Sequence, residues 1–137
     1  MATLIRTYEA GKASQHAVGI TGGVGTGNTA LLNSPADWLS FAAGALDNAG
    51  DPFISSPPAT DGTKISILDT DHLGYALFQN NPSATSMWVW KSFLRGHHPI
   101  LMEDLQGSTG WVAGRSTMGH TRSYATRMDL AAMAPRS

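Results

Sequence analysis

The sequence of 137 residues contains no cysteine, and only 14% of its residues are charged. The lack of thiols excludes disulfides and thiolate metal sites in this chain. The net charge is −1 and the nine basic residues are scattered, so charge gives no reason to expect nucleic acid or an anionic membrane as a partner. No apolar run approaches the roughly 20 residues of a membrane span. The segment after Met1 also lacks the basic and long apolar regions of a signal peptide.

The length fits one domain with a modest core. The low charged fraction suggests that part of the surface is buried against another body. Helices are expected at 2–10, from Ser86 to Gly96 and at 111–132, strands at 15–21, 36–41, 64–68 and 98–102, and loops at 22–35, 42–63 and 73–85. Strands that alternate with helices predict an α/β fold with a parallel sheet and right-handed crossovers. The strands are continuous apolar runs, which is typical of strands covered on both faces.

Helical spacing also predicts which side chains face the core. The helix that begins at Ser86 is expected to pack through Met87, Trp90, Phe93 and Leu94, and the last helix through Met118, Thr121, Ala125, Met128 and Ala132.

The strand at 64–68 runs directly into Asp69, Asp71 and His72. Period-two counting puts residues 65, 67, 69 and 71 on one face, so both carboxylates would project near the carboxyl end of the strand. Neighbouring carboxylates push their pKa values apart, which suits acid, base or nucleophilic roles. An Asp-capped turn explains the same residues without any chemistry. Glu103 and Asp104 end the next strand, where they could join this cluster or cap the final helix.

Two candidate sites are disfavoured. The segment 22–29 has the spacing of a phosphate-binding loop, but Asn28 occupies the place of the essential lysine. His97 and His98 could complete a metal site with His72 and the two aspartates, but their spacing matches no metal motif and they lie at the start of their strand. We therefore expect no metal and no other cofactor.

Four tryptophans are present: Trp38, Trp88, Trp90 and Trp111. Aromatic rings form platforms for the apolar faces of sugars. Trp38 is the better platform candidate, because it lies beside Asp37 near a strand end, whereas Trp90 fits a core position.

Seven separated segments, in chain order, resemble a bacterial glycoside-hydrolase-like family: parts of 9–21, NSPADW at 33–38, 58–64, DTDHL at 69–73, WVWKSFLRG at 88–96, 98–102 and 118–133. Members have a TIM-barrel domain, commonly followed by a β-domain named for collagen binding. The resemblance covers nearly the whole chain and implies that it is the C-terminal half of a (β/α)8 barrel, with strands 5 to 8 at 15–21, 36–41, 65–69 and 99–103 and no second domain.

The resemblance implies a carbohydrate substrate and a catalytic carboxylate after strand 7, at Asp69 or Asp71. The acid/base glutamate after strand 4 is not in this chain, so the fragment is expected to be inactive alone. Substrate contacts are expected from His72, Asp37, Trp38, His16, Glu103 and Asp104. The parent protein is expected to be secreted or periplasmic, although this chain carries no signal peptide.

The chain departs from the family pattern in two places. It has Leu101-Met102-Glu103-Asp104 where members show an aromatic residue and Met-Asp-Pro, and its loop after His72 is longer and lacks a tryptophan. The class of sugar therefore stays open. Two other readings also stay open: a non-catalytic carbohydrate-binding half-barrel that closes by self-association, and a nucleotide-binding α/β domain that uses the Gly-rich loop.

Overall fold

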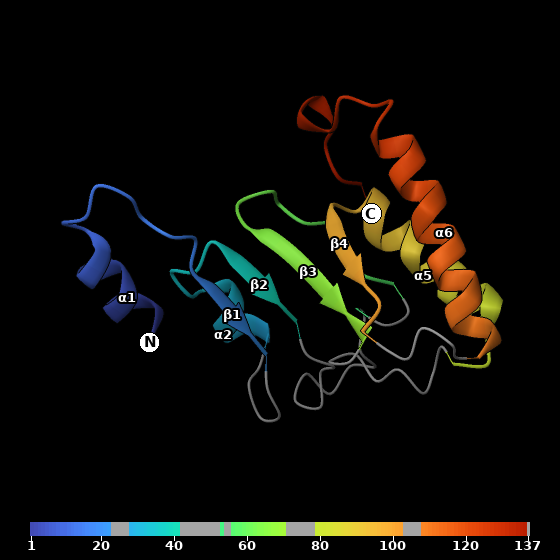
Figure 1. Ribbon diagram of the computed structural model, residues 1–137, viewed down its shortest axis with the longest axis horizontal. Coiled ribbons are helices and arrows are strands. Elements are labelled where there is room, and N and C mark those ends of the chain that lie inside the picture. The colour runs from blue at the N-terminus through green and yellow to red at the C-terminus, as the bar shows by residue number, and fades with distance from the viewer. Residues whose placement is uncertain (23–27, 42–52, 54–55, 71–78, 103–107, 137) are drawn as a thin grey trace.

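Four parallel strands form one sheet in the computed structural model, which describes all residues except 23–27, 42–52, 54–55, 71–78, 103–107 and 137. The strands are β1 (Gly19–Thr21), β2 (Trp38–Ser40), β3 (Ile65–Asp69) and β4 (His97–Ile100). Their spatial order is their chain order, β1-β2-β3-β4, with every neighbouring pair parallel (Figure 1). The predicted α/β class, with four parallel strands and flanking helices, is confirmed.

The strand β4 differs from both of its predicted bounds, 98–102 from the apolar pattern and 99–103 from the resemblance. It begins at His97, which pairs with Ser66 of β3, and it ends at Ile100. Gly96, at φ +83, turns the chain directly from the preceding helix into the sheet, so no linker separates the two elements. β3 has the bounds that the resemblance implies and lies one residue later than the 64–68 expected from the apolar pattern.

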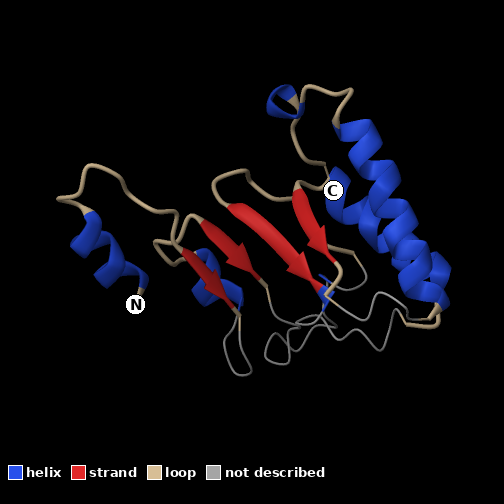
Figure 2. Ribbon diagram, in the orientation of Figure 1, coloured by secondary structure: helices blue, strands red, loops and turns tan. Residues whose placement is uncertain are grey.

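One face of the sheet is covered by helices (Figure 2). Leu39 of β2 and Leu68 of β3 are about 1% exposed or less. They share a buried cluster with side chains from three helices: Leu31 of α2 (Asn28–Leu32), Trp88 and Val89 of α5 (Pro82–Leu94) and Trp111 of α6 (Thr109–Ala125). This face therefore holds the core of the described part of the chain.

The opposite face, which we call the open face, carries the alternate residues of the same strands. The register aligns Trp38 with Ile65, and Asp69 with Ile100. Ile65 is 54% exposed and Ile100 is 37% exposed. The expectation that both faces are covered is therefore wrong for the described residues, which leave an apolar sheet surface open to solvent.

The predicted start and inner face of α5 are both wrong. The helix begins at Pro82, because the Asn81 side chain accepts a hydrogen bond from the Ala84 backbone N–H (3.0 Å) and proline is well suited to the first helical position. The buried residues are Thr85, Trp88, Val89 and Ser92. The expected Met87 and Leu94 are more than half exposed.

The face of α5 that is buried differs from the predicted one because small residues line the contact between α5 and α6. A Cβ added to Gly114 would lie 2.8 Å from Thr85 Cγ2. Thr117 Oγ1, in the next turn of α6, lies within hydrogen-bond distance of Ser86 Oγ (3.0 Å). The two backbones approach closely where these residues meet, and larger apolar side chains are directed elsewhere.

The helix α6 ends at Ala125, earlier than the predicted 132, and a 3-10 turn, η2 (Leu130–Ala132), follows it. Of the residues predicted to face inward, Met118 packs on the core and Thr121 is buried. Met128 is 37% exposed, and Ala125 and Ala132 are not buried. After α6 the chain folds back toward β4, and Pro135 lies against Gly96, the residue before that strand.

The segment 22–35 is not entirely loop, because it contains the short helix α2, anchored by Leu31. The N-terminal helix α1 (Ala2–Glu9) has nearly its predicted bounds and lies beyond β1, at the edge of the sheet farthest from α6 (Figure 1). Its apolar residues Leu4 and Tyr8 are about 70% exposed. Polar contacts described below attach α1 to the sheet.

A close contact between β1 and β2 gives a testable prediction. A Cβ added to Gly19 would overlap the Trp38 ring, which lies directly over this glycine. Gly19→Ala is therefore expected to lower the free energy of unfolding by about 1–3 kcal/mol, since the ring must move. Urea denaturation measures this change.

Two controls belong to the same experiment. Gly11→Ala meets no atom within 4 Å, so it is expected to be neutral or slightly stabilising. In a Trp38→Ala background, Gly19→Ala should cost at least about 0.5 kcal/mol less, since the obstacle is gone. An equal cost in both backgrounds would contradict the contact.

Candidate functional site

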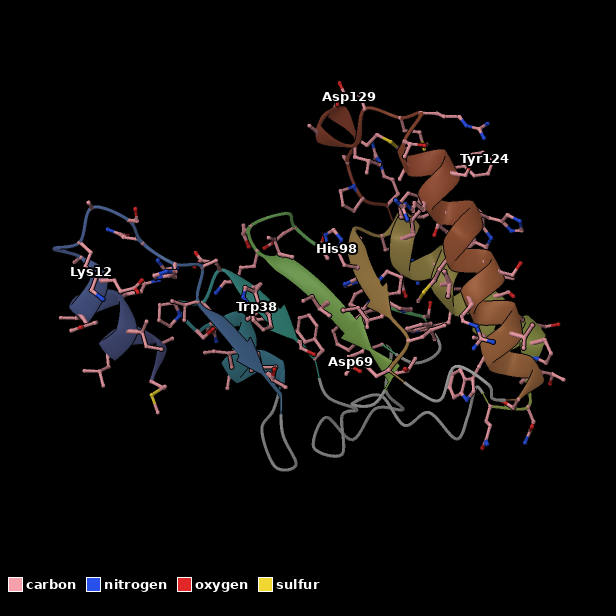
Figure 3. All side chains as sticks on the ribbon, in the orientation of Figure 1. Lys12, Trp38, Asp69, His98, Tyr124 and Asp129 are labelled. Carbon is pink, nitrogen blue, oxygen red and sulfur yellow. The ribbon has the colours of Figure 1, made fainter. Side chains whose placement is uncertain are left out.

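Asp69 is the last residue of β3, at the carboxyl end of the sheet (Figure 3). It shares the open face with Ile65 and Ile67 by strand alternation, and it is 9% exposed. Carboxyl ends of parallel strands are where α/β folds place their chemistry. Asp69 is thus a nearly buried carboxyl group at the edge of the sheet where a reaction site is expected.

Thr70 holds the ends of β3 and β4 together. Its side chain is fully buried. Its Oγ1 accepts a hydrogen bond from the Met102 backbone N–H (3.2 Å) and lies 3.4 Å from the Ile100 carbonyl oxygen. Asp69 therefore sits in a backbone whose position is fixed by the neighbouring strand.

Four of the predicted site residues, Asp71, His72, Glu103 and Asp104, lie outside the described residues. It therefore stays a prediction that the carboxylates of Asp71, Glu103 and Asp104 lie near Asp69. The segment 23–27 of the Gly-rich loop also lies outside them.

His16, Asp37 and Trp38 lie away from Asp69, at or before the amino ends of their strands (Figure 3 labels Trp38). Among the described residues, the structure therefore places these three at the opposite ends of the strands from Asp69. His16 pairs with Glu9, from its backbone N–H to Oε2 (2.8 Å) and from Nδ1 to Oε1 (2.7 Å). Asp37 pairs with Arg6 and accepts a hydrogen bond from the Val18 N–H (2.8 Å). Both pairs attach α1 to the sheet.

The pKa of Asp37 is held below its usual value of 3.8. The largest cause is the hydrogen bond from the Val18 backbone N–H, and the second is the Arg6 guanidinium group. A carboxyl group with a lowered pKa binds protons less readily in the folded than in the unfolded chain. Its stabilising effect is therefore present above pH 3.8 and is lost as the pH falls through the lower pKa of the folded protein.

This linkage predicts a pH-dependent mutant effect. Asp37→Asn is expected to lower the free energy of unfolding at neutral pH, and its difference from the wild type should shrink below pH 3.8. Arg6→Gln removes only the guanidinium group, the second cause of the lowered pKa. It should therefore reduce the dependence of stability on pH less than Asp37→Asn does. Urea titrations between pH 7 and pH 2 measure both variants. A difference that stays constant over this range would contradict the assignment.

His97 has a structural role at the amino end of β4. It is 4% exposed, and both ring nitrogens have partners: Nδ1 lies 2.6 Å from Ser66 Oγ and Nε2 lies 2.7 Å from the Pro58 carbonyl oxygen. Because a carbonyl only accepts, Nε2 carries the proton and Nδ1 accepts from Ser66. Burial lowers the pKa of His97, so the ring is neutral near pH 7.

Among the described residues, no group of three or more His, Cys, Asp or Glu side chains could hold a metal ion. No helix in that part of the chain is long and apolar enough to cross a membrane. One further feature, a hollow between β4 and the segment after α6, could not be predicted from the sequence, because the residues of its wall belong to elements far apart in the chain.

No protein-family model, no curated protein and no solved structure matches this chain, so its assignment to the glycoside-hydrolase-like family depends on the resemblance of its sequence segments alone.

Proposed function

We propose that this chain contributes four strands of a (β/α)8 barrel of the glycoside-hydrolase type, in which Asp69 or Asp71 acts on a glycosidic bond. One observation carries the proposal: a nearly buried carboxyl group, Asp69, ends a parallel strand on the open face of a sheet whose strands follow chain order. In (β/α)8 barrels, consecutive strands are neighbours and the site lies at their carboxyl ends. A doubly wound sheet instead reverses its strand order, and the described strands contain no reversal.

The distribution of apolar residues supports the same architecture. In a barrel, helices cover the outer face and branched apolar side chains of the inner face fill the interior. The open face carries Ile65, Ile67 and Ile100, and the opposite face carries the helices. Strands added beside β1 and β4 would close the sheet and bury these isoleucines.

The proposed chemistry needs a second carboxyl group. In retaining hydrolysis, one carboxylate attacks the anomeric carbon while a carboxylic acid about 5–5.5 Å away protonates the leaving oxygen, and water then cleaves the glycosyl ester. This chain would supply the attacking carboxylate after the seventh strand. The acid would come from the other half of the barrel, so the chain alone is expected to be inactive.

The test joins this chain to the polypeptide encoded in frame upstream of Met1 and assays the product on a panel of aryl glycosides. The upstream sequence is expected to contain a strand that ends in Asn-Glu, and the joined protein is expected to hydrolyse at least one glycoside. The absence of such a strand, or an inactive but folded joined protein, would contradict the proposal.

The open face also favours a second candidate, a non-catalytic half-barrel that closes with another copy of itself. Exposed apolar faces and unpaired strand edges promote association. Sedimentation of the isolated chain distinguishes the two: a stable dimer favours this module, and a monomer at high concentration excludes it.

A further inference from the structure

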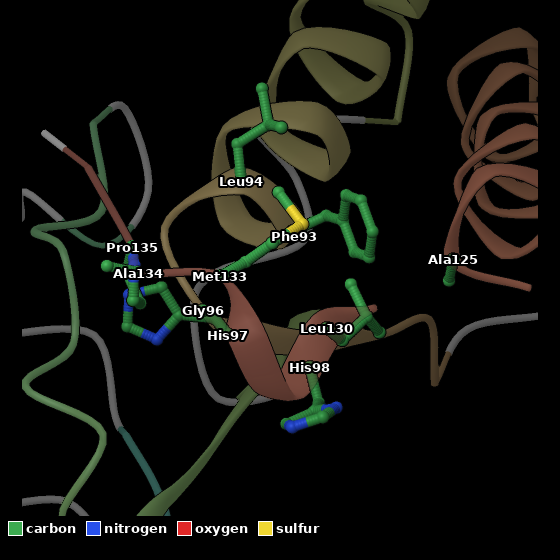
Figure 4. A pocket seen from close by; sticks show the side chains of 10 residues that line it. All are labelled: Phe93, Leu94, Gly96, His97, His98, Ala125, Leu130, Met133, Ala134 and Pro135. Atoms are coloured by element: carbon green, nitrogen blue, oxygen red, sulfur yellow. The ribbon is translucent and has the colours of Figure 1, made fainter. Parts of the chain in front are cut away.

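A hollow of about 340 Å³ lies at the amino end of β4, between the end of α5 and the segment that follows α6 (Figure 4). Figure 4 shows the Phe93 ring, the Met133 side chain and the Leu130 side chain gathered around one space. Leu130 and Met133 are nearly half exposed. A hollow of this size, lined mainly by apolar side chains, is typical of small-molecule sites.

The hollow has one polar side chain with capacity to bind a ligand. His97 contributes to the wall, but its two nitrogens already bond Ser66 and Pro58, and burial keeps the ring neutral. His98 lies beside it on the open face and is exposed. Within the described part of the chain, no hydrogen bond is made to the His98 ring. His98 can therefore donate a hydrogen bond to a ligand group.

A second hollow, of about 430 Å³, adjoins the first. Both hollows are lined by His98, Leu130 and Met133. The second one adds polar side chains, among them Lys64 and Asp37. The Asp37 carboxylate is already paired with Arg6. The Lys64 ammonium group donates one hydrogen bond to the Ser34 carbonyl oxygen, which leaves two N–H donors and a positive charge at this end of the space. The two hollows together form an apolar space that opens onto a polar, cationic one.

We infer that these hollows bind a small amphiphilic carboxylate, with its apolar body between Phe93, Leu130 and Met133 and its carboxylate near His98 and Lys64. The site lies at the amino ends of β3 and β4, whereas Asp69 lies at the carboxyl end of β3. The ligand is therefore separate from the proposed substrate. The inference does not depend on the barrel proposal.

Calorimetric titration with decanoate tests this site. The chain is expected to bind decanoate with a Kd of about 0.1–1 mM, the affinity that ligand efficiency allows for a molecule of this size. Met133→Glu places a charge in the apolar wall and should weaken binding at least about tenfold. Met87→Glu is the matched control, because Met87 is similarly exposed on α5 and does not line either hollow. It should leave binding unchanged within about twofold.

Two further variants make the result decisive. Leu130→Gln changes a second residue of the wall and should also weaken binding. It provides the test if the Met133 variant does not fold. His98→Ala should weaken decanoate binding and leave decanol binding unchanged. Asp69→Asn should change neither, which separates this site from the proposed reaction site. A wild type that does not bind decanoate at 1 mM, equal binding by the Met133 and Met87 variants, or equal weakening of decanoate and decanol by His98→Ala would overturn the inference.

Discussion

Asn in place of the proposed catalytic carboxylate, Asp69 or Asp71, is expected to lower kcat of the proposed joined enzyme by at least about a hundredfold, the low end of the effect of a positioned catalytic group. The change keeps the size of the side chain and removes only its charge and nucleophilic oxygen. Asp69 is held at the end of β3 beside the Thr70 anchor, so its replacement is not expected to move the backbone. Initial rates on the best aryl glycoside measure the effect.

The control for these variants is Asp129→Asn, an exposed carboxylate just before η2. It should keep the wild-type rate. If both strand-end variants retain full activity, the chain does not carry the attacking carboxylate. If only one loses activity, that residue is the nucleophile and the other has a structural or binding role.

Trp88→Ala is expected to cause the largest loss of stability, about 3–5 kcal/mol of the free energy of unfolding. The ring is 1% exposed within the core, and its Nε1 donates a hydrogen bond to the Phe53 carbonyl oxygen (3.0 Å). Truncation would leave a cavity and a buried carbonyl without its donor. Because small domains are stable by only about 5–15 kcal/mol, urea denaturation should detect the change at once.

Trp90→Ala is the matched comparison, two residues further along the same helix. Its ring is partly exposed and packs edge-on against Phe93 and Tyr124, so its removal should cost about 1–2 kcal/mol. Trp88→Phe keeps most of the volume if the alanine variant does not fold. A larger loss at Trp90 than at Trp88 would mean that the face predicted from hydrophobic spacing is the one that packs.

The parallel sheet and the position of Asp69 could be predicted because both depend on local pattern. The apolar run at 65–68 ends abruptly in a carboxylate, and strands alternate with helices. Such patterns can be recognised in the sequence because they depend on consecutive residues of one segment and not on which other element packs against it.

The inner face of α5 could not be predicted in the same way. Its buried stripe mixes Thr85 and Ser92 with Trp88 and Val89, and hydrophobic spacing ranks the exposed Met87 and Leu94 above the two polar residues. Close packing against Gly114 of α6 makes the small residues the better choice. That preference belongs to the helix pair, and it is not visible in either helix alone.

The sequence could not predict that Asp37 and Trp38 lie at the opposite ends of the strands from Asp69. Asp37 and Trp38 adjoin a strand, but the strand's direction in the sheet decides which edge they occupy. Their bonds to Arg6 and their contact with Gly19 show that these residues stabilise the start of the sheet.

The order of the strands has a consequence for how fast the chain folds. Gly19 pairs with Trp38, Trp38 with Ile65 and Ser66 with His97, so the partners are 19, 27 and 31 residues apart. No described strand pair is a hairpin, and each pairing must close a long loop before it gains any hydrogen bonds. Chains dominated by such distant pairings fold slowly. The helices α5 and α6 are therefore expected to form before the strands pair, because the backbone hydrogen bonds of a helix join residues that are close in the chain.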